Sequence, residues 1–60
     1  MSNLNDMWSE LRTLVESTEV DVLKNNNGNK AAGVRARRSL RLIKNKSSNL
    51  VKASLEMDKN

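Results

Sequence analysis

The stretch Asn25-Asn26-Asn27-Gly28-Asn29 divides the sequence into two parts, because it is the only cluster of turn-forming residues in the chain. Glycine and asparagine tolerate the left-handed backbone conformation that ends a helix, and an asparagine side chain can cap the start of the next helix. The sequence therefore predicts a single turn, at residues 25–29, between two segments of regular structure.

The segment before the turn has the periodicity of an amphipathic helix. Positions on one face recur every three or four residues; they are Leu4, Trp8, Leu11, Val15, Thr18 and Val22, with Met7, Leu14 and Leu23 beside them. Ser2, Asn3 and Asn5 are candidate N-caps. Acidic and β-branched residues alternate over 18–22, which is also typical of a short strand. We expect a helix over about 3–24.

The segment after the turn repeats the pattern over a greater length and predicts a second helix over about 30–57. Its periodic positions are Ala36, Leu40, Ile43, Ser47, Leu50, Ser54 and Met57, with Val51 and Leu55 beside them. Several of these residues are small, so we expect the two helices to pack closely near the turn. The predicted fold is all-α, a single antiparallel two-helix hairpin over residues 1–60.

Length and composition indicate that this hairpin does not act alone. Ordering a residue costs about 1.5 kcal/mol, and a chain of 60 residues with one aromatic side chain, Trp8, has little with which to offset that cost. The absence of Cys and His rules out disulfides and the usual His/Cys metal sites. We therefore expect a homodimer, as a four-helix bundle or coiled coil, with no cofactor, no metal and no enzymatic activity.

Charge is divided between the two halves of the chain. Residues 1–29 hold two basic and five acidic side chains, a net charge of −3, whereas residues 30–60 hold nine basic and two acidic side chains, a net charge of +7. A basic half of this kind is typical of proteins that bind a polyanion. The candidate DNA-binding residues are Lys30, Arg35, Arg37, Arg38, Arg41, Lys44, Lys46 and Lys52.

The start of the basic segment carries a family motif. Residues 28–40 read Gly-Asn-Lys-Ala-Ala-Gly-Val-Arg-Ala-Arg-Arg-Ser-Leu. This stretch resembles the bacterial histone H1-like family typified by chlamydial Hc1, and the resemblance extends in layout over nearly the whole chain. It implies a small nucleoid-associated protein that compacts or coats DNA with little sequence preference. Chlamydial members also carry a Lys- and Ala-rich C-terminal tail that residues 1–60 do not contain, so relatives with the helical domain alone are the better comparison.

Three other features favour structural interpretations over functional ones. The motif from Gly28 to Gly33 lacks the Lys-Ser/Thr pair and the preceding strand of a phosphate-binding P-loop, which favours a turn with close helix packing. Trp8 is expected in the core, because it shares the periodicity of the apolar positions on the acidic helix. Acidic pairs such as Glu16 with Glu19 are expected to be ordinary exposed carboxylates.

The preferred function is architectural DNA binding through the phosphate backbone, with RNA as another possible polyanion. If each chain meets about 4 to 6 phosphates, the logarithm of the affinity should fall with the logarithm of salt at a slope of about −4 to −5 per chain. The alternative is a small helical interaction or regulatory module that docks on an acidic protein. A basic helix lying on an anionic membrane is a third interpretation, which an apolar face without aromatic residues disfavours.

The sequence also bears on localisation. Residues 1–11 lack the basic and then continuously apolar pattern of a signal peptide, and no stretch approaches the roughly 18 apolar residues that cross a bilayer. We therefore expect a soluble, cytoplasmic protein that associates with the nucleoid, or a virus-encoded one that acts in the host cytoplasm.

Overall fold

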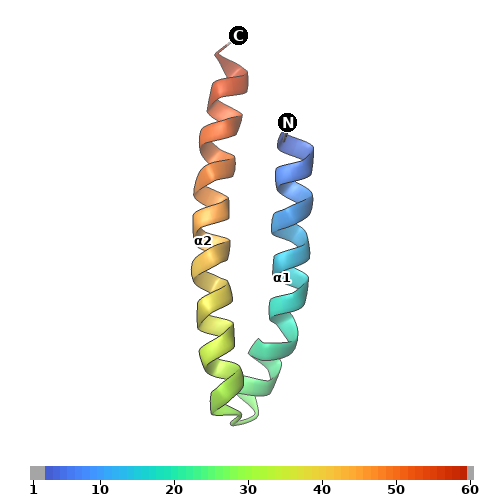
Figure 1. Cartoon of the computed structure of the whole chain (residues 1–60), viewed down its shortest axis with the longest axis vertical. Coiled ribbons are helices and arrows are strands. Elements are labelled where there is room, and N and C mark those ends of the chain that lie inside the picture. Colours follow the sequence, from blue (N-terminus) through green and yellow to red (C-terminus); the bar gives the residue numbers. More distant parts are fainter. Residues whose placement is uncertain (1–2, 60) are drawn as a thin grey trace.

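The computed structural model describes residues 3–59, which form two α-helices joined by a short turn (Figure 1). Helix α1 comprises Leu4–Asn26 and helix α2 comprises Lys30–Asp58. The helices lie antiparallel and side by side, in a body that is 49 Å long and 15 Å across in both other directions. The predicted all-α two-helix hairpin is confirmed. Residues 18–22 are helical throughout, so the strand alternative for that segment is wrong.

Asparagine side chains cap the N-termini of both helices. The side chain of Asn3 accepts a hydrogen bond from the backbone N–H of Asp6 at 2.9 Å, and the side chain of Asn29 accepts one from Ala32 at 2.9 Å. Each cap satisfies one of the N–H groups that a helix leaves without a partner in its first turn. Another candidate cap, Ser2, lies outside the described residues.

The turn is shorter than the run of asparagines suggests, because Asn25 and Asn26 complete the last turn of α1. Gly28 has a φ of +95°, a conformation that a residue with a Cβ adopts only with strain. The backbone N–H of Asn29 then donates to the carbonyl of Lys24 at 3.0 Å, which satisfies one of the last carbonyls of α1. The chain therefore reverses direction within three residues.

The contact between the helices is a narrow seam that is tightest near the turn. Leu11 and Thr18 are buried on α1, and Ala32, Gly33 and Ala36 are buried on α2. A Cβ on Gly33 would lie 2.5 Å from Nδ2 of Asn25, so a larger residue at this position would displace the end of that side chain. Half-buried residues continue the seam; they are Leu4, Met7, Leu14 and Asp21 on α1, and Ser39, Ile43, Lys46, Ser47, Leu50 and Ala53 on α2.

The predicted burial of Trp8 is wrong, since 55 % of this residue is exposed. The seam runs through Met7, Leu11 and Leu14, which places Trp8 and Val15 at its edge. The apolar stripe of α1 is wider than a single partner helix can cover, and the small residues of α2 meet only one side of that stripe. On α2 the same displacement leaves Leu40 and Ser54, both expected in the contact, exposed. Among residues 3–59, neither helix has an apolar stretch long enough to cross a bilayer.

Candidate nucleic-acid interface

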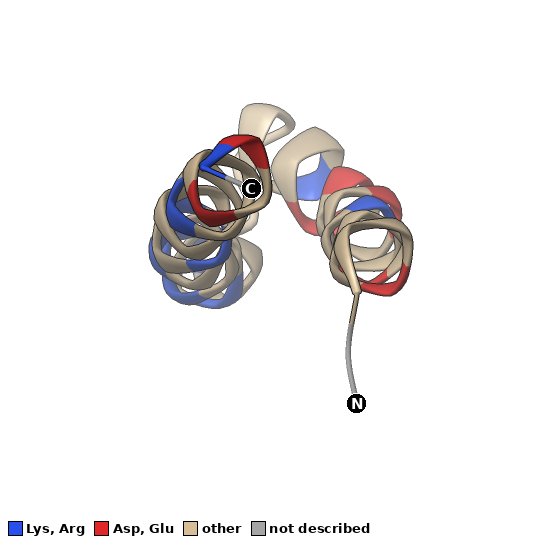
Figure 2. Ribbon diagram, turned by 90° about the horizontal axis from the view of Figure 1, so that it is seen from above, with Lys and Arg blue, Asp and Glu red and all other residues tan. Residues whose placement is uncertain are grey.

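The two helices carry opposite net charge. Figure 2 shows lysine and arginine gathered on the side of α2 turned away from α1, while aspartate and glutamate lie mainly on α1. This arrangement follows from the division of charge in the sequence, because each half of the chain forms one helix. The hairpin therefore has a basic edge on α2, whereas most of its acidic residues belong to α1.

Six of the eight candidate residues form the basic edge of α2, which we term the basic face. They are exposed and recur at helical spacing on the side opposite the seam; they are Lys30, Arg37, Arg38, Arg41, Lys44 and Lys52. None of the six is in an ion pair within residues 3–59. Lys30 and Lys52 are 22 residues apart in one helix, so the basic face is about 33 Å long, which matches about ten base pairs of DNA.

The other two candidates, Arg35 and Lys46, are on a different side of α2 and pair with acidic residues of α1. Nε of Arg35 lies 3.1 Å from Oδ1 of Asp21, and Nζ of Lys46 lies 3.7 Å from Oε2 of Glu10. Both side chains remain about half exposed, so each pair adds only a modest amount to stability. Their position fixes the register of the two helices, and their charge is already opposed by a carboxylate.

The acidic residues of α1 make contacts within the hairpin or lie exposed on its surface. Glu16 accepts a hydrogen bond from Nε of Arg12 at 3.1 Å within α1, and Asp21 is held by Arg35 across the seam. Glu19 is exposed at the edge of a groove between the helices. Glu16 and Glu19 are exposed, as the sequence predicted, whereas the Asp21 side chain is only 22 % exposed.

Two N–H groups in the first turn of α2 donate to acceptors within the protein. The Asn29 side chain takes the N–H of Ala32, and the Asn29 carbonyl accepts the N–H of Gly33 at 3.2 Å. Ala32 is fully buried, so a phosphate has no access to its backbone. The structural interpretation of the glycine motif, a turn followed by close helix packing, is thus the one that the geometry supports.

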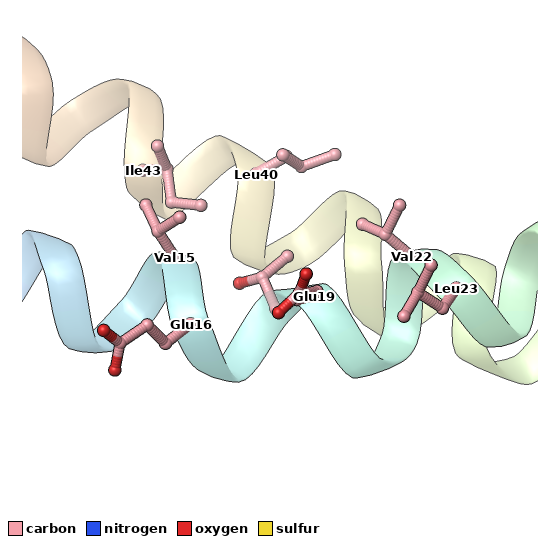
Figure 3. Close-up of a pocket in the computed structure, with 8 residues that line it drawn as sticks. Val15, Glu16, Glu19, Val22, Leu23, Leu40 and Ile43 are labelled. Atoms are coloured by element: carbon pink, nitrogen blue, oxygen red, sulfur yellow. The ribbon is translucent and has the colours of Figure 1, made fainter.

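An apolar groove beside the seam is the feature that the sequence analysis missed. It has a volume of about 420 Å³ and is lined mainly by Val15 and Val22 of α1 and by Leu40 and Ile43 of α2 (Figure 3). The available signal was the width of the apolar stripes, which exceeds what two helices need in order to cover each other. Stripe residues were all assigned to the contact within the hairpin, although part of each stripe faces outward.

Comparison with known proteins places almost the whole chain in one family. Residues 5–60 match the family described as histone H1-like protein Hc1. The match includes the motif at residues 28–40 and confirms the resemblance seen in the sequence. No curated protein and no solved structure matches the chain. Because the match spans all but the first four residues, the chain belongs to the histone H1-like Hc1 family.

Proposed function

We propose that this chain is an architectural DNA-binding protein that associates with the nucleoid and contacts the phosphate backbone with little sequence specificity. The observation that carries the proposal is the basic face, in which six exposed lysines and arginines lie along one side of α2 without partners among residues 3–59. Membership of a histone H1-like family supports the same conclusion independently.

The physical basis of binding is release of counterions from DNA. Each lysine or arginine that neutralises a phosphate releases condensed cations. Each such contact therefore makes the slope of the logarithm of the affinity against the logarithm of the salt concentration more negative by about 0.9. Arginine also forms bidentate hydrogen bonds with phosphate oxygens, and three of the six residues are arginines: Arg37, Arg38 and Arg41. Contacts of this kind hold the protein on the duplex but carry no sequence information.

The acidic residues of α1 support a preferred orientation on DNA. Glu10 and Asp21 hold Lys46 and Arg35 against α1, so these two candidates are less available to phosphate than the basic face. The carboxylates of α1 are repelled by the polyanion. We therefore expect DNA to meet the side of α2 that is turned away from α1, with α1 directed into solvent.

The test is fluorescence anisotropy of labelled duplexes titrated with the protein from about 50 to 200 mM salt. With about 4 to 6 phosphates met by each chain, we expect a slope of about −4 to −5 per chain. Two duplexes of unrelated sequence should bind within about ten-fold of each other. The triple variant R37E/R38E/R41E should lose binding at every salt concentration.

Two results would overturn this function. A slope near zero would mean that phosphates are not the contact, and unchanged affinity in the triple variant would mean that the basic face is not the site. Absence of binding to any duplex at low salt would instead favour docking on an acidic protein partner. A matched titration with duplex RNA of the same sequence distinguishes a DNA-binding protein from a general polyanion binder.

A further inference from the structure

The turn between the helices contains a reactive dipeptide, Asn27-Gly28, which lies outside the basic face. Asn27 is the one asparagine of the sequence that is followed by glycine. Because glycine has no Cβ, its backbone nitrogen is the least hindered nucleophile that can follow an asparagine. Attack of this nitrogen on the carbon of the side-chain amide closes a five-membered succinimide ring. The turn therefore combines an amide with a neighbouring group that can displace the amide nitrogen.

Among residues 3–59, Asn27 is exposed and its side chain forms no hydrogen bond. Helix α1 ends at Asn26, so Asn27 lies outside both helices, at the end of the hairpin opposite the start of α1 (Figure 1). Gly28 is also exposed, and a Cβ built on it would meet nothing within 4 Å. By contrast, the side chains of Asn3 and Asn29 each accept a hydrogen bond at 2.9 Å as helix caps. Water therefore reaches the amide of Asn27.

The folded turn holds the two reacting atoms apart. Asn27 has a ψ of 12°, which turns the nitrogen of Gly28 towards the backbone nitrogen of Asn27 and away from its Cβ. The N–H of Gly28 also donates a hydrogen bond to the carbonyl of Asn25 at 2.9 Å. Ring closure requires rotation about ψ and loss of the Gly28 proton, and both require that this hydrogen bond breaks. The ring therefore forms only while the turn is open.

The turn can open without unfolding of the hairpin, because its hydrogen bonds are local. The N–H of Asn27 donates to the carbonyl of Lys24 at 3.1 Å, and the N–H of Asn29 donates to the same carbonyl at 3.0 Å. The buried residue Leu11 lies about 24 Å from Asn27 along α1. Breaking a few exposed hydrogen bonds at the turn leaves the contacts of Leu11 in place, which is the condition for local opening.

We propose that Asn27 is a site of spontaneous deamidation, reached by local opening of the turn and requiring water but no enzyme or cofactor. The nitrogen of Gly28 bonds to Cγ of Asn27 as the bond from Cγ to Nδ2 breaks, and Nδ2 leaves as ammonia together with the Gly28 proton. Water then hydrolyses the ring without oxidation or reduction. Cleavage of the bond from the Gly28 nitrogen to Cγ leaves aspartate at position 27, and cleavage of its bond to the main-chain carbonyl leaves isoaspartate.

Both products weaken the turn. Aspartate adds a negative charge at the C-terminal end of α1, where the helix dipole is already negative, and lowers the net charge of +4 by one. Isoaspartate routes the main chain through Cβ and so lengthens it, which disturbs the hydrogen bonds from Gly28 to Asn25 and from Asn29 to Lys24. Because ammonia is lost, modified chains accumulate with the age of the protein. The reaction does not involve the basic face, so it holds or fails independently of DNA binding.

The first test incubates the full chain at mildly alkaline pH, which favours loss of the Gly28 proton, and follows its mass. Asparagine is a thermolabile residue, and each deamidation adds about 1 Da. Peptide mapping should place the gain at Asn27, and N27Q should gain little mass over the same period, because glutamine would have to form a six-membered ring. An equal gain in N27Q, a gain spread evenly over the asparagines of both helices, or no gain even in the urea-unfolded chain would overturn the proposal.

The second test asks whether the turn must open. The chain unfolded in urea should deamidate at least about ten-fold faster than the folded chain, because the folded turn is closed most of the time. N29A and N3A are a matched pair, since each removes one helix cap, but Asn3 lies about 36 Å from Asn27 along α1. N29A should accelerate deamidation of the folded chain by about five-fold, and N3A should leave the rate unchanged. Equal rates in the folded and unfolded chains would overturn the protective role of the turn, and equal acceleration by both variants would overturn local opening.

The third test measures the stability of the products by urea unfolding followed by circular dichroism. N27D, which is the aspartate product, should lower the ratio of folded to unfolded chain by about two- to five-fold. The isoaspartate form, separated by chromatography from an aged sample, should lower this ratio by at least about ten-fold, because two backbone hydrogen bonds of the turn are disturbed. An isoaspartate form as stable as the unmodified chain would overturn the claim that the modification weakens the turn.

Discussion

Gly33 and Gly28 are constrained for different physical reasons, and substitutions can separate the two reasons. A Cβ on Gly33 would lie 2.5 Å from Nδ2 and 2.9 Å from Cγ of Asn25, whose side chain donates to the carbonyl of Asn29 at 3.3 Å. Gly28 has open space around it, but its φ is +95°. A side chain at position 33 would therefore clash with Asn25, whereas a side chain at position 28 would strain the backbone.

The expected magnitude for Gly33→Ala comes from two opposing effects. Alanine inside a helix is favoured over glycine by about 1 kcal/mol, whereas displacing the Asn25 side chain loses a hydrogen bond that contributes about 0.5 to 1.5 kcal/mol. The two effects nearly cancel, so the free energy of unfolding should change by less than about 0.5 kcal/mol. In an Asn25→Ala background the side chain that a Cβ would meet is absent. Gly33→Ala should then stabilise the protein by about 1 kcal/mol, the preference of a helix for alanine over glycine.

Urea unfolding followed by circular dichroism, at one fixed protein concentration, measures this cycle of four proteins. The predicted coupling between positions 25 and 33 is about 1 kcal/mol. Gly28→Ala, with no neighbour to displace, should cost about 1 to 2 kcal/mol in either background because of its positive φ. Equal effects of Gly33→Ala with and without the Asn25 side chain would refute the claim that this side chain, rather than the backbone, opposes a Cβ at position 33.

Two further predictions concern stability and can be measured by the same unfolding experiment. Asn29→Ala removes the N-cap of α2 and should lower the free energy of unfolding by about 1 kcal/mol. Asn29→Asp keeps an acceptor for the N–H of Ala32 and should lower it much less. Equal losses of stability in the two variants would contradict the capping role. Leu11→Ala removes the largest buried side chain of the seam and should lower the free energy of unfolding by about 2 to 3 kcal/mol. Val20→Ala, at a site 54 % exposed, should change it by less than about 0.5 kcal/mol. Similar effects at both sites would contradict the position of the seam.

The fold was predictable because local signals agree with one another along the chain. The asparagine and glycine cluster marks a reversal, and the periodicity on both sides of it is helical, so a hairpin is the simplest arrangement. The face that each helix turns to its partner was not predictable to the same degree. Trp8 and Leu11 belong to one broad stripe, and only the interhelical pairs and the small residues of α2 determine that Leu11 is buried and Trp8 is not.

The candidate site was predictable as a set of residues in two groups, but not in the partners of the second group. Charge counts identify the basic segment that holds all eight candidate residues, and helical spacing separates Arg35 and Lys46 from the other six. That these two pair with Asp21 and Glu10 depends on the register of the two helices, which the sequence pattern does not specify. The groove was missed because periodicity shows that a stripe is apolar, but not how many partners it has.

The most direct measurement of the central claim compares two double variants of equal net charge. R38Q/R41Q removes two residues of the basic face, and R35Q/K46Q removes the two that pair with α1. In salt titrations with one duplex, R38Q/R41Q should make the slope of log affinity against log salt concentration less negative by about 2, or about 0.9 for each lost contact. R35Q/K46Q should change the same slope by less than about 0.5. Equal changes in slope for the two variants would mean that DNA senses only net charge, and would contradict a binding site on the outer side of α2.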